Sequence, residues 1–203
     1  MIEIPQSIYI LSKNPGKLKE INDILRPFSF SMRSIYQDYS PGDVPETGSS
    51  YAENALLKAR RGFEVSGKFC VGEDSGLEID ALDGAPGLYS ARFGGELFST
   101  QDKNERILEL LKDIPPKQRS ARFVCVAALA WEGGERLFEG HCEGWIAQET
   151  RGQSGFGYDP IFILPPYDQT FAELGEKIKN RFSHRALAFR KLVEFLLSKP
   201  DNS

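Results

Sequence analysis

The feature that most constrains the fold is a long apolar run from Ala121 to Trp131. It is rich in valine and alanine, and Phe123 and Val124 within it favour extended structure. We therefore predict a central strand here. The segment Leu137–Ile146 follows across a Gly133-Gly134 turn, and this arrangement predicts a second strand paired to the first.

Shorter periodic segments on both sides of this pair predict alternating strands and helices. Helical spacing of apolar residues, and a Ser50–Glu53 capping pattern, indicate the helices. We expect strands at Ser7–Leu11, Phe69–Val71, Leu77–Ile79 and Ile161–Leu164, and helices at Lys17–Leu25, 50–63, Asn104–Leu111, parts of Thr170–Asn180, and after Ser183. This mixture predicts an α/β protein with a mixed sheet, and 203 residues fit one domain or two closely joined lobes.

Composition excludes several classes of protein. The formal net charge of −4 argues against broad nucleic-acid binding, which favours a basic face. Apolar runs fall short of the roughly 18–20 residues that span a bilayer, and the first residues lack the pattern of a signal peptide. The three cysteines show no C-x-x-C spacing and are expected to be reduced and packed in strands. We expect a cytoplasmic protein without membrane or nucleic-acid partners.

The first candidate site is the loop Ser12-Lys13-Asn14-Pro15-Gly16-Lys17, between a predicted strand and a predicted helix. Free backbone N–H groups at a helix start favour an anion, and the helix dipole adds to this preference. Ser12 and Asn14 can donate hydrogen bonds to phosphate oxygens, while Lys13 and Lys17 add positive charge. The spacing is not that of a P-loop, and a solvated turn that caps a surface helix remains an alternative.

A second cluster is acidic. Glu46 precedes Thr47-Gly48, and Glu73 and Asp74 follow a predicted strand. Carboxylates without nearby histidine or cysteine suit a hard cation such as Mg²⁺, which commonly bridges carboxylates and substrate phosphates. The alternative is that Glu73 and Asp74 are turn residues beside Ser75 and Gly76.

A third cluster is the segment from Ser154 to Pro160, in which glycines flank Phe156. A flat base could stack on this ring, which is worth roughly 1–3 kcal/mol at single-stranded nucleic-acid sites. The alternative is that Phe156 and Tyr158 pack in the core. A fourth cluster places Lys179, His184 and Arg185 near a helix start, where cations oppose the helix dipole. Donors from His184 and Arg185 could recognise a carbonyl on a base edge.

Taken together, these clusters resemble the inosine triphosphate pyrophosphatase family, whose members hydrolyse nonstandard purine nucleoside triphosphates. The resemblance runs from Ser12 to about Leu192. It rests on seven motifs: Ser12-x-Asn14-x-x-Lys17, Glu46-Thr47-Gly48, Glu53-Asn54-Ala55-x-x-Lys58-Ala59, Glu73-Asp74-Ser75-Gly76-Leu77, Gly84-Ala85-Pro86-Gly87-x-Tyr89-Ser90-Ala91-Arg92, Gly155-Phe156-Gly157-Tyr158-Asp159-Pro160 and Ser183-His184-Arg185. Two positions depart from the family pattern: Ser12 stands where Thr is common, and Glu73 where Asp is common.

The resemblance implies an elongated α/β fold of two lobes, with a twisted mixed sheet flanked by helices and a cleft between the lobes. It implies a homodimer, Mg²⁺ dependence and release of pyrophosphate. It assigns Glu46 and Asp74 to the metal, with Glu73 as a further candidate, and Asp74 as the catalytic base. By the resemblance, substrate would be bound by Ser12, Asn14, Lys17, Lys58, Ser75, Phe156, Gly157, Tyr158, Asp159, Lys179, His184 and Arg185. Lys13 is a further substrate-binding candidate because of its charge in the loop after the first strand.

Two questions stay open from the sequence. Asp74 would either accept a proton from the attacking water or hold the metal, and the two roles could coincide. The rival functions are a nucleotide-binding sensor without turnover and a pyrimidine triphosphate pyrophosphatase on a related fold. The acids and lysines argue against a sensor, and the Phe156 loop with His184-Arg185 argues for a purine.

Overall fold

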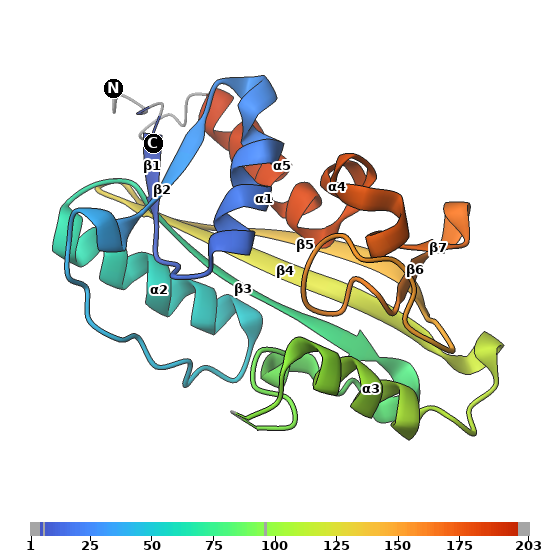
Figure 1. The fold of residues 1–203 in the computed structure, drawn as a ribbon. Coiled ribbons are helices and arrows are strands. Elements are labelled where there is room, and N and C mark those ends of the chain that lie inside the picture. Colours follow the sequence, from blue (N-terminus) through green and yellow to red (C-terminus); the bar gives the residue numbers. More distant parts are fainter. Residues whose placement is uncertain (1–4, 6, 96, 199–203) are drawn as a thin grey trace. The chain divides into compact units, whose positions relative to one another are not determined.

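The computed structural model describes residue 5, residues 7–95 and residues 97–198. Within this part of the chain, seven strands form one sheet in the order β2-β1-β3-β4-β5-β6-β7 (Figure 1). The strands are β1 Ser7–Ile10, β2 Ser31–Ser34, β3 Cys70–Ile79, β4 Ser120–Trp131, β5 Gly134–Ile146, β6 Phe162–Leu164 and β7 Gln169–Thr170. The predicted long strands are therefore confirmed as β4 and β5, which are neighbours in the sheet.

The helices are α1 Pro15–Leu25, α2 Tyr51–Ser66, α3 Thr100–Leu110, α4 Phe171–Phe182 and α5 His184–Leu197. Short 3-10 turns lie at Arg26–Phe28, Ile35–Gln37, Asp80–Leu82, Gly87–Tyr89, Pro116–Gln118 and Pro165–Tyr167. The Ser50 hydroxyl accepts the Glu53 N–H at 3.2 Å, as a cap should, but the Glu53 carboxylate accepts from Ser49 instead of Ser50. Helix α4 is interrupted at Gly175, where φ is 74°, so the expectation of a partly helical segment is confirmed.

The sheet is mixed, as predicted. Strand β1 pairs in parallel with β2 on one side and with β3 on the other, whereas β6 pairs antiparallel with β5 and β7. The chain therefore leaves β1 for one neighbour and later returns to pair with its other side. In open α/β sheets, ligands bind beyond the carboxyl end of a strand at which the strand order reverses in this way. The loop after β1 holds this position.

The chain divides into two compact units, which are described separately. Unit 1 comprises residues 1–74, 125–140 and 184–203, and unit 2 comprises residues 75–124 and 141–183. In unit 1 the sheet is covered on both faces (Figure 1). One core cluster joins α1 and α5 to Cys125, Ala127 and Leu129 of β4, while α2 packs its alanines against Val126 and Ala128. The alternation along β4 thus supplies two hydrophobic faces.

Helix α2 lies very close to β3, and Gly72 makes this possible. A Cβ atom added at Gly72 would lie 2.0 Å from the Ala55 carbonyl oxygen and 2.6 Å from the Ala59 nitrogen. This close packing holds β3 against α2 at Gly72, immediately before Glu73 and Asp74.

Unit 2 has a core of its own. Phe123, Phe162 and Phe171 pack together at centroid separations of 4.5 to 6.2 Å, and the buried ring of Tyr158 belongs to the same cluster. Helix α3 contributes Ile107. Each unit therefore has a buried apolar cluster of its own.

One prediction about β3 was wrong. The segments Phe69–Val71 and Leu77–Ile79 are not separate strands, because β3 is continuous through Glu73-Asp74-Ser75-Gly76. The turn interpretation of Glu73 and Asp74 is therefore also wrong. Residues 70–74 are all buried and β3 lies between β1 and β4, so sheet pairing outweighs the local turn preference of Asp, Ser and Gly.

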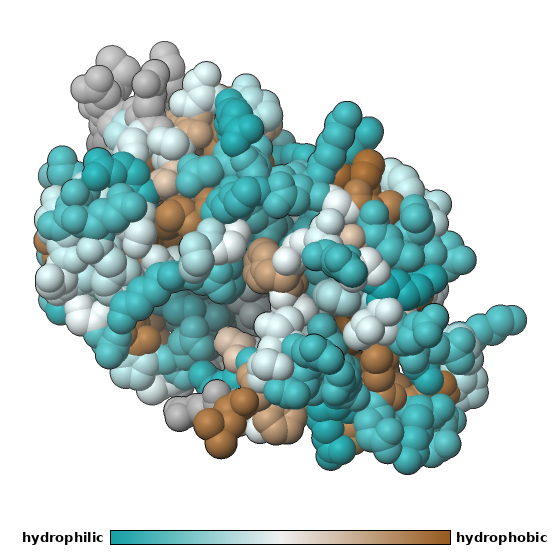
Figure 2. Space-filling model, viewed as in Figure 1, coloured by the Kyte–Doolittle hydropathy of each residue, from teal (hydrophilic) through white to brown (hydrophobic). Residues whose placement is uncertain are grey.

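Cys70, Cys125 and Cys142 are free thiols, each buried in a strand, as predicted. Among the described residues, no helix is both long enough and apolar enough to cross a membrane. On the face shown in Figure 2, hydrophilic residues cover most of the surface and hydrophobic ones appear in small separate areas. That face therefore lacks the large apolar patch that marks many docking surfaces.

Candidate active site

The loop after β1 is held by its own polar side chains. Asn14 is the N-cap of α1, and its Oδ1 accepts the Lys17 N–H at 3.0 Å. The Ser12 hydroxyl accepts the Asn14 N–H at 3.2 Å. The side chain of Lys13 is exposed and pairs with Asp43 at 2.8 Å. The loop therefore caps α1, which both interpretations of the sequence allow, and phosphate binding by this loop stays a prediction.

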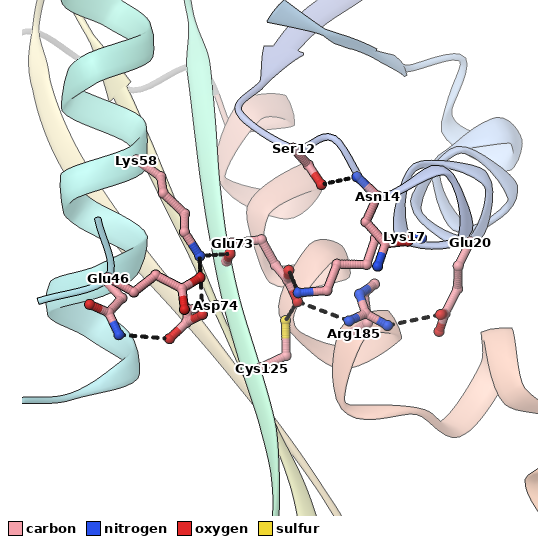
Figure 3. A network of polar contacts seen from close by, with 11 residues as sticks. Ser12, Asn14, Lys17, Glu20, Glu46, Lys58, Glu73, Asp74, Cys125 and Arg185 are labelled. Carbon is pink, nitrogen blue, oxygen red and sulfur yellow. Dashed lines mark hydrogen bonds and ion pairs between the residues drawn. The ribbon is translucent and has the colours of Figure 1, made fainter. Parts of the chain in front are cut away.

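Lys58 lies at the centre of an acidic cluster on the α2 side of β3 (Figure 3). Its ammonium contacts Glu46 Oε1 at 2.6 Å, Asp74 Oδ1 at 3.1 Å and the Glu73 carbonyl oxygen at 3.1 Å. The remaining oxygen of Asp74, Oδ2, accepts from the Asn54 amide at 3.1 Å. Three residues predicted from distant motifs, Glu46, Lys58 and Asp74, therefore meet at one point.

Electrostatics in this cluster are strongly coupled. Burial raises the pKa of Asp74 above its ordinary value, and the neighbouring Lys58 charge offsets part of that rise. For Lys58, burial acts to lower the pKa, but Asp74 and Glu46 outweigh it and the net shift is upward. Lys58 therefore stays charged. A carboxylate with a raised pKa is a stronger base than an exposed aspartate.

Glu73 points to the other face of β3 from Asp74, because successive side chains alternate along a strand. Its Oε2 pairs with Lys17 at 2.6 Å and its Oε1 with Arg185 at 2.9 Å (Figure 3). The Glu73 side chain is 1% exposed. Glu73 is therefore the centre of a buried ion-pair network, and metal binding by its carboxylate stays a prediction. The extra methylene relative to Asp lengthens the arm that spans Lys17 and Arg185.

Arg185 also lies in the interior. Its Nη1 donates to Glu20 at 2.8 Å and its Nη2 to Glu73, so both terminal nitrogens are bound by carboxylates. Its side chain is 2% exposed. In this structure Arg185 is therefore an internal ion-pair partner, and its contact with a base stays a prediction. His184, which begins α5, is likewise buried, and its contact with a base stays a prediction.

In unit 2, the Phe156 loop is organised by Asp159. The Asp159 Oδ2 accepts the Phe156 N–H at 2.8 Å and the Lys179 ammonium at 2.6 Å. The same ammonium lies 4.2 Å from the centroid of the Phe156 ring, which is a cation–π contact. Asp159 and Lys179 are both buried. The structure thus brings together Phe156, Asp159 and Lys179, which the sequence predicted as substrate-binding.

The neighbouring predicted residues are placed differently. The Tyr158 ring packs in the core of unit 2 and its hydroxyl donates to the Ser90 carbonyl at 2.7 Å, so its side chain follows the packing alternative. The Gly157 carbonyl accepts from Asn104 at 3.2 Å. Ser75 is half-buried within β3. Backbone contacts by Gly157 and Tyr158 with a nucleotide stay predictions.

A family model described as the Ham1 family matches residues 8–195. The chain belongs to the Ham1 family. This membership confirms the resemblance that the sequence motifs suggested.

Ham1 family relatives cover nearly the whole chain. A dITP/XTP pyrophosphatase of Desulforamulus reducens is 44% identical over 93% of this chain and 94% of its own, and one of Bacillus subtilis is 45% identical over 97% and 99%. Among solved structures, a Ham1 protein from Coxiella burnetii has a TM-score of 0.85 at 38% identity, covering 95% of this chain and 98% of its own. The mixed α/β fold of the Ham1 family is therefore shared.

The acidic cluster of this Ham1 chain supplies only some of the ligands that a magnesium ion needs. Within the described residues, no group of three or more carboxylate, imidazole or thiolate side chains is close enough to bind a metal. Glu46 and Asp74 nevertheless converge on one ammonium, and both donate hard oxygen atoms. Mg²⁺ commonly takes one or two carboxylates and completes its shell with water and substrate phosphates. The residues present therefore fit a magnesium that arrives with a phosphorylated substrate.

One residue at the site was missed by the sequence reasoning. Asn54 is 1% exposed and donates to Asp74, whereas the sequence motif gives it no role of its own. The signal that could have identified Asn54 is its position on the face of α2 that packs against the sheet. A buried amide at such a position needs hydrogen-bond partners.

Proposed function

We propose that this protein hydrolyses nonstandard purine nucleoside triphosphates, such as dITP, ITP and XTP, to the nucleoside monophosphate and pyrophosphate. The observation that carries the proposal is the convergence of Glu46 and Asp74 on the Lys58 ammonium. Lys58 lies on α2, Asp74 on β3 and Glu46 in the loop that precedes α2. Leu11, which directly follows β1, donates its N–H to the Val71 carbonyl at 2.9 Å, and Asp74 comes three residues after Val71 on β3. A cation, a buried base and a capped helix start are thus gathered beside the carboxyl end of β1.

The sequence relatives support the substrate class. Both of those described above are named dITP/XTP pyrophosphatase, and each matches this chain over more than nine-tenths of its length. We infer the same class of substrate for this chain.

In the proposed reaction, water attacks a phosphorus atom and pyrophosphate leaves. Asp74 accepts the proton of the attacking water, for which burial has raised its pKa. General-base catalysis of this kind contributes roughly 10²–10⁴-fold to the rate. Lys58 and Lys17 supply positive charge for the phosphate oxygens, and the amide groups at the start of α1 bind the anionic tail.

We propose Mg²⁺ as the cofactor, held by Glu46 and Asp74. When bound, the ion offsets charge on the phosphate oxygens. Lys58 holds the two carboxylates together before the ion arrives, since its ammonium contacts both. Without a cation in this position, the buried Asp74 and the half-buried Glu46 would repel each other.

We propose that Phe156 stacks against the purine. Its ring is fixed by the bond of its N–H to Asp159 and by the Lys179 ammonium near its centre. A carbonyl at position 6 distinguishes inosine and xanthosine from adenosine, and a buried donor that loses its partner can reject an analogue by about 10⁴–10⁵-fold. The residues predicted to supply this donor are His184 and Arg185, which are both buried, and Glu20 and Glu73 fix the Arg185 guanidinium in place.

We further propose a homodimer and a cytoplasmic location. The dimer rests on the family resemblance, and size-exclusion chromatography with light scattering would test it. The location rests on three buried free thiols, which suit a reducing compartment, and on the nucleotide pool that supplies the substrate.

A substrate panel tests the proposed function. Initial rates of pyrophosphate release would be measured with dITP, ITP, XTP, GTP, ATP, dCTP and dUTP, with Mg²⁺ and again with excess EDTA. We expect release from the first three with Mg²⁺ only. Equal rates for ITP and ATP would defeat the specificity claim, preference for dUTP or dCTP would favour a pyrimidine enzyme, and tight ITP binding without release would favour a sensor.

A further inference from the structure

The loop that carries Glu46 has no regular structure of its own. Between the 3-10 turn that ends at Gln37 and the start of α2 at Tyr51, no helix or strand is present in the described residues. A catalytic or metal-binding carboxylate on such a segment needs support from rigid neighbours, because ligand-binding loops otherwise open easily.

Asn54 provides that support with both ends of its amide. Its Oδ1 accepts the Gly48 N–H at 2.8 Å, two residues after Glu46, and its Nδ2 donates to Asp74 Oδ2 at 3.1 Å. Asn54 lies in the first turn of α2, where its own N–H bonds to the Ser50 carbonyl at 3.1 Å. The amide is therefore fixed to a helix while it contacts the loop and the strand.

The approach of the loop to this amide is very close. A Cβ atom added at Gly48 would lie 2.7 Å from Asn54 Oδ1 and 2.7 Å from Glu53 Cβ. Only glycine allows the loop backbone to lie against the helix at this distance. The contact is also buried, because Asn54 is 1% exposed.

Asn54 and Lys58 make different contacts with the loop and with Asp74. They lie four residues apart on α2 and so share one face of the helix. Lys58 joins the two carboxylates by charge, whereas Asn54 joins the loop backbone to the second oxygen of Asp74. If a divalent cation takes the place of the Lys58 ammonium between the acids, Asn54 still binds Asp74 directly and still holds the Glu46 loop at Gly48.

We propose that Asn54 is a positioning residue that ties the Glu46 loop to Asp74 and so holds both carboxylates ready for the divalent cation. This inference rests on the proposed function. Outer groups that orient metal ligands typically change metal affinity or activity by about 10–100-fold when they are removed. Asn54 touches no substrate in this account, and it acts through the two acids.

Two variants separate the two ends of the amide. Asn54→Leu keeps the approximate volume and removes both hydrogen bonds. Asn54→Asp keeps the acceptor for Gly48 but replaces the donor to Asp74 with a like charge. The matched control is Asn22→Leu, because Asn22 also uses both amide ends, accepting from Met32 N–H at 2.8 Å and donating to its carbonyl at 3.0 Å, without touching the acids.

The first readout is Mn²⁺ binding in the presence of saturating α,β-methylene-ITP. It is measured as the loss of the free Mn²⁺ signal in electron paramagnetic resonance. We expect both Asn54 variants to bind Mn²⁺ at least about 10-fold more weakly than the parent protein. We expect Asn22→Leu to bind it as the parent does, although it loses thermal stability. Affinity of the analogue without metal is expected to change by less than about twofold in every variant.

The second readout is amide hydrogen exchange of residues 46–50 in the metal-free protein. Asn54→Leu is expected to speed exchange there, whereas Asn54→Asp and Asn22→Leu are not, because both retain the acceptor for Gly48. Parent-like Mn²⁺ affinity and slow exchange in Asn54→Leu would overturn the positioning role. If Asn54→Leu does not fold, parent-like Mn²⁺ affinity in Asn54→Asp overturns the Asp74 part. A parent protein that binds no Mn²⁺ with the analogue would instead defeat the proposed function.

Discussion

Removal of the Glu73 carboxylate is the most informative perturbation of the ion-pair network, because it separates a structural role from a metal-binding one. In the native protein, Glu73 pairs with Arg185 at 2.9 Å and with Lys17 at 2.6 Å, and its side chain is 1% exposed. Loss of one partner of a buried pair typically costs about 3–5 kcal/mol, because the other charge is left buried without compensation.

The structure reduces this estimate to the lower end. Arg185 keeps its bond to Glu20 at 2.8 Å, and the Lys17 side chain is 22% exposed and can reach water. We therefore expect Glu73→Ala to lower the free energy of unfolding by about 3 kcal/mol. With a urea m-value of about 2 kcal/mol/M, the midpoint would fall by about 1.5 M.

The assay is urea unfolding in the presence of EDTA, monitored by tryptophan fluorescence. A Trp145→Phe background leaves Trp131 as the reporter, because the chain has two tryptophans. Trp131 packs against Phe69 and Phe195 in the core of unit 1, at centroid separations of 6.3 and 5.6 Å. It therefore reports on the unit that contains Glu73.

The matched control is Glu135→Ala. Glu135 pairs with Arg60 at 2.7 Å, but both side chains are more than a third exposed, so the expected cost is below about 1 kcal/mol. A midpoint shift below about 0.5 M for Glu73→Ala would refute the reasoning. An unchanged midpoint in EDTA together with the loss of Mg²⁺-induced stabilisation would restore Glu73 as a metal ligand.

Four further changes test other parts of the account. Asp74→Asn should lower kcat by at least about 10²-fold in steady-state assays while calorimetry shows retained nucleotide binding, and near-normal turnover would remove Asp74 from the mechanism. Phe156→Ala should weaken binding of α,β-methylene-ITP by about 1–3 kcal/mol, and unchanged binding would exclude stacking. Burial raises the pKa of Cys70 and of Cys142 to about 12, and only the thiolate reacts. At pH 8 about one thiol in 10⁴ is ionised, so disulfide reagents should label the native protein slowly, and faster as pH rises or after unfolding, while rapid native labelling would contradict the burial. Gly72→Ala should destabilise unit 1 by about 1–3 kcal/mol in the Trp131 assay, since its Cβ would meet the α2 backbone, and a neutral result would contradict that packing.

Much of the fold could be predicted from local pattern. The apolar run of β4, the glycine turn before β5 and the capped helices carry signals that depend on near neighbours in sequence. The course of β3 could not be predicted, because Asp, Ser and Gly favour turns locally and only burial between β1 and β4 decides otherwise. That error also hid the alternation that sends Glu73 and Asp74 to opposite faces.

The same limit applies to the site. Motifs identified Glu46, Lys58 and Asp74 as candidates, and the packing of α2 on β3 brings them together. The ion pair of Arg185 with Glu20 could not be inferred, because the two residues lie 165 positions apart in sequence. A cation at a helix start suggested a ligand, and the tertiary structure adds two buried carboxylates beside it.

The most direct test of the central claim is the product of dITP hydrolysis, followed by ³¹P nuclear magnetic resonance with Mg²⁺ present. In the proposed reaction, Asp74 and the two lysines assist an attack by water that releases the outer two phosphates as one unit. We therefore predict that pyrophosphate and dIMP appear together in equal amounts, with no dIDP at any time. Orthophosphate with dIDP as an early product would contradict it.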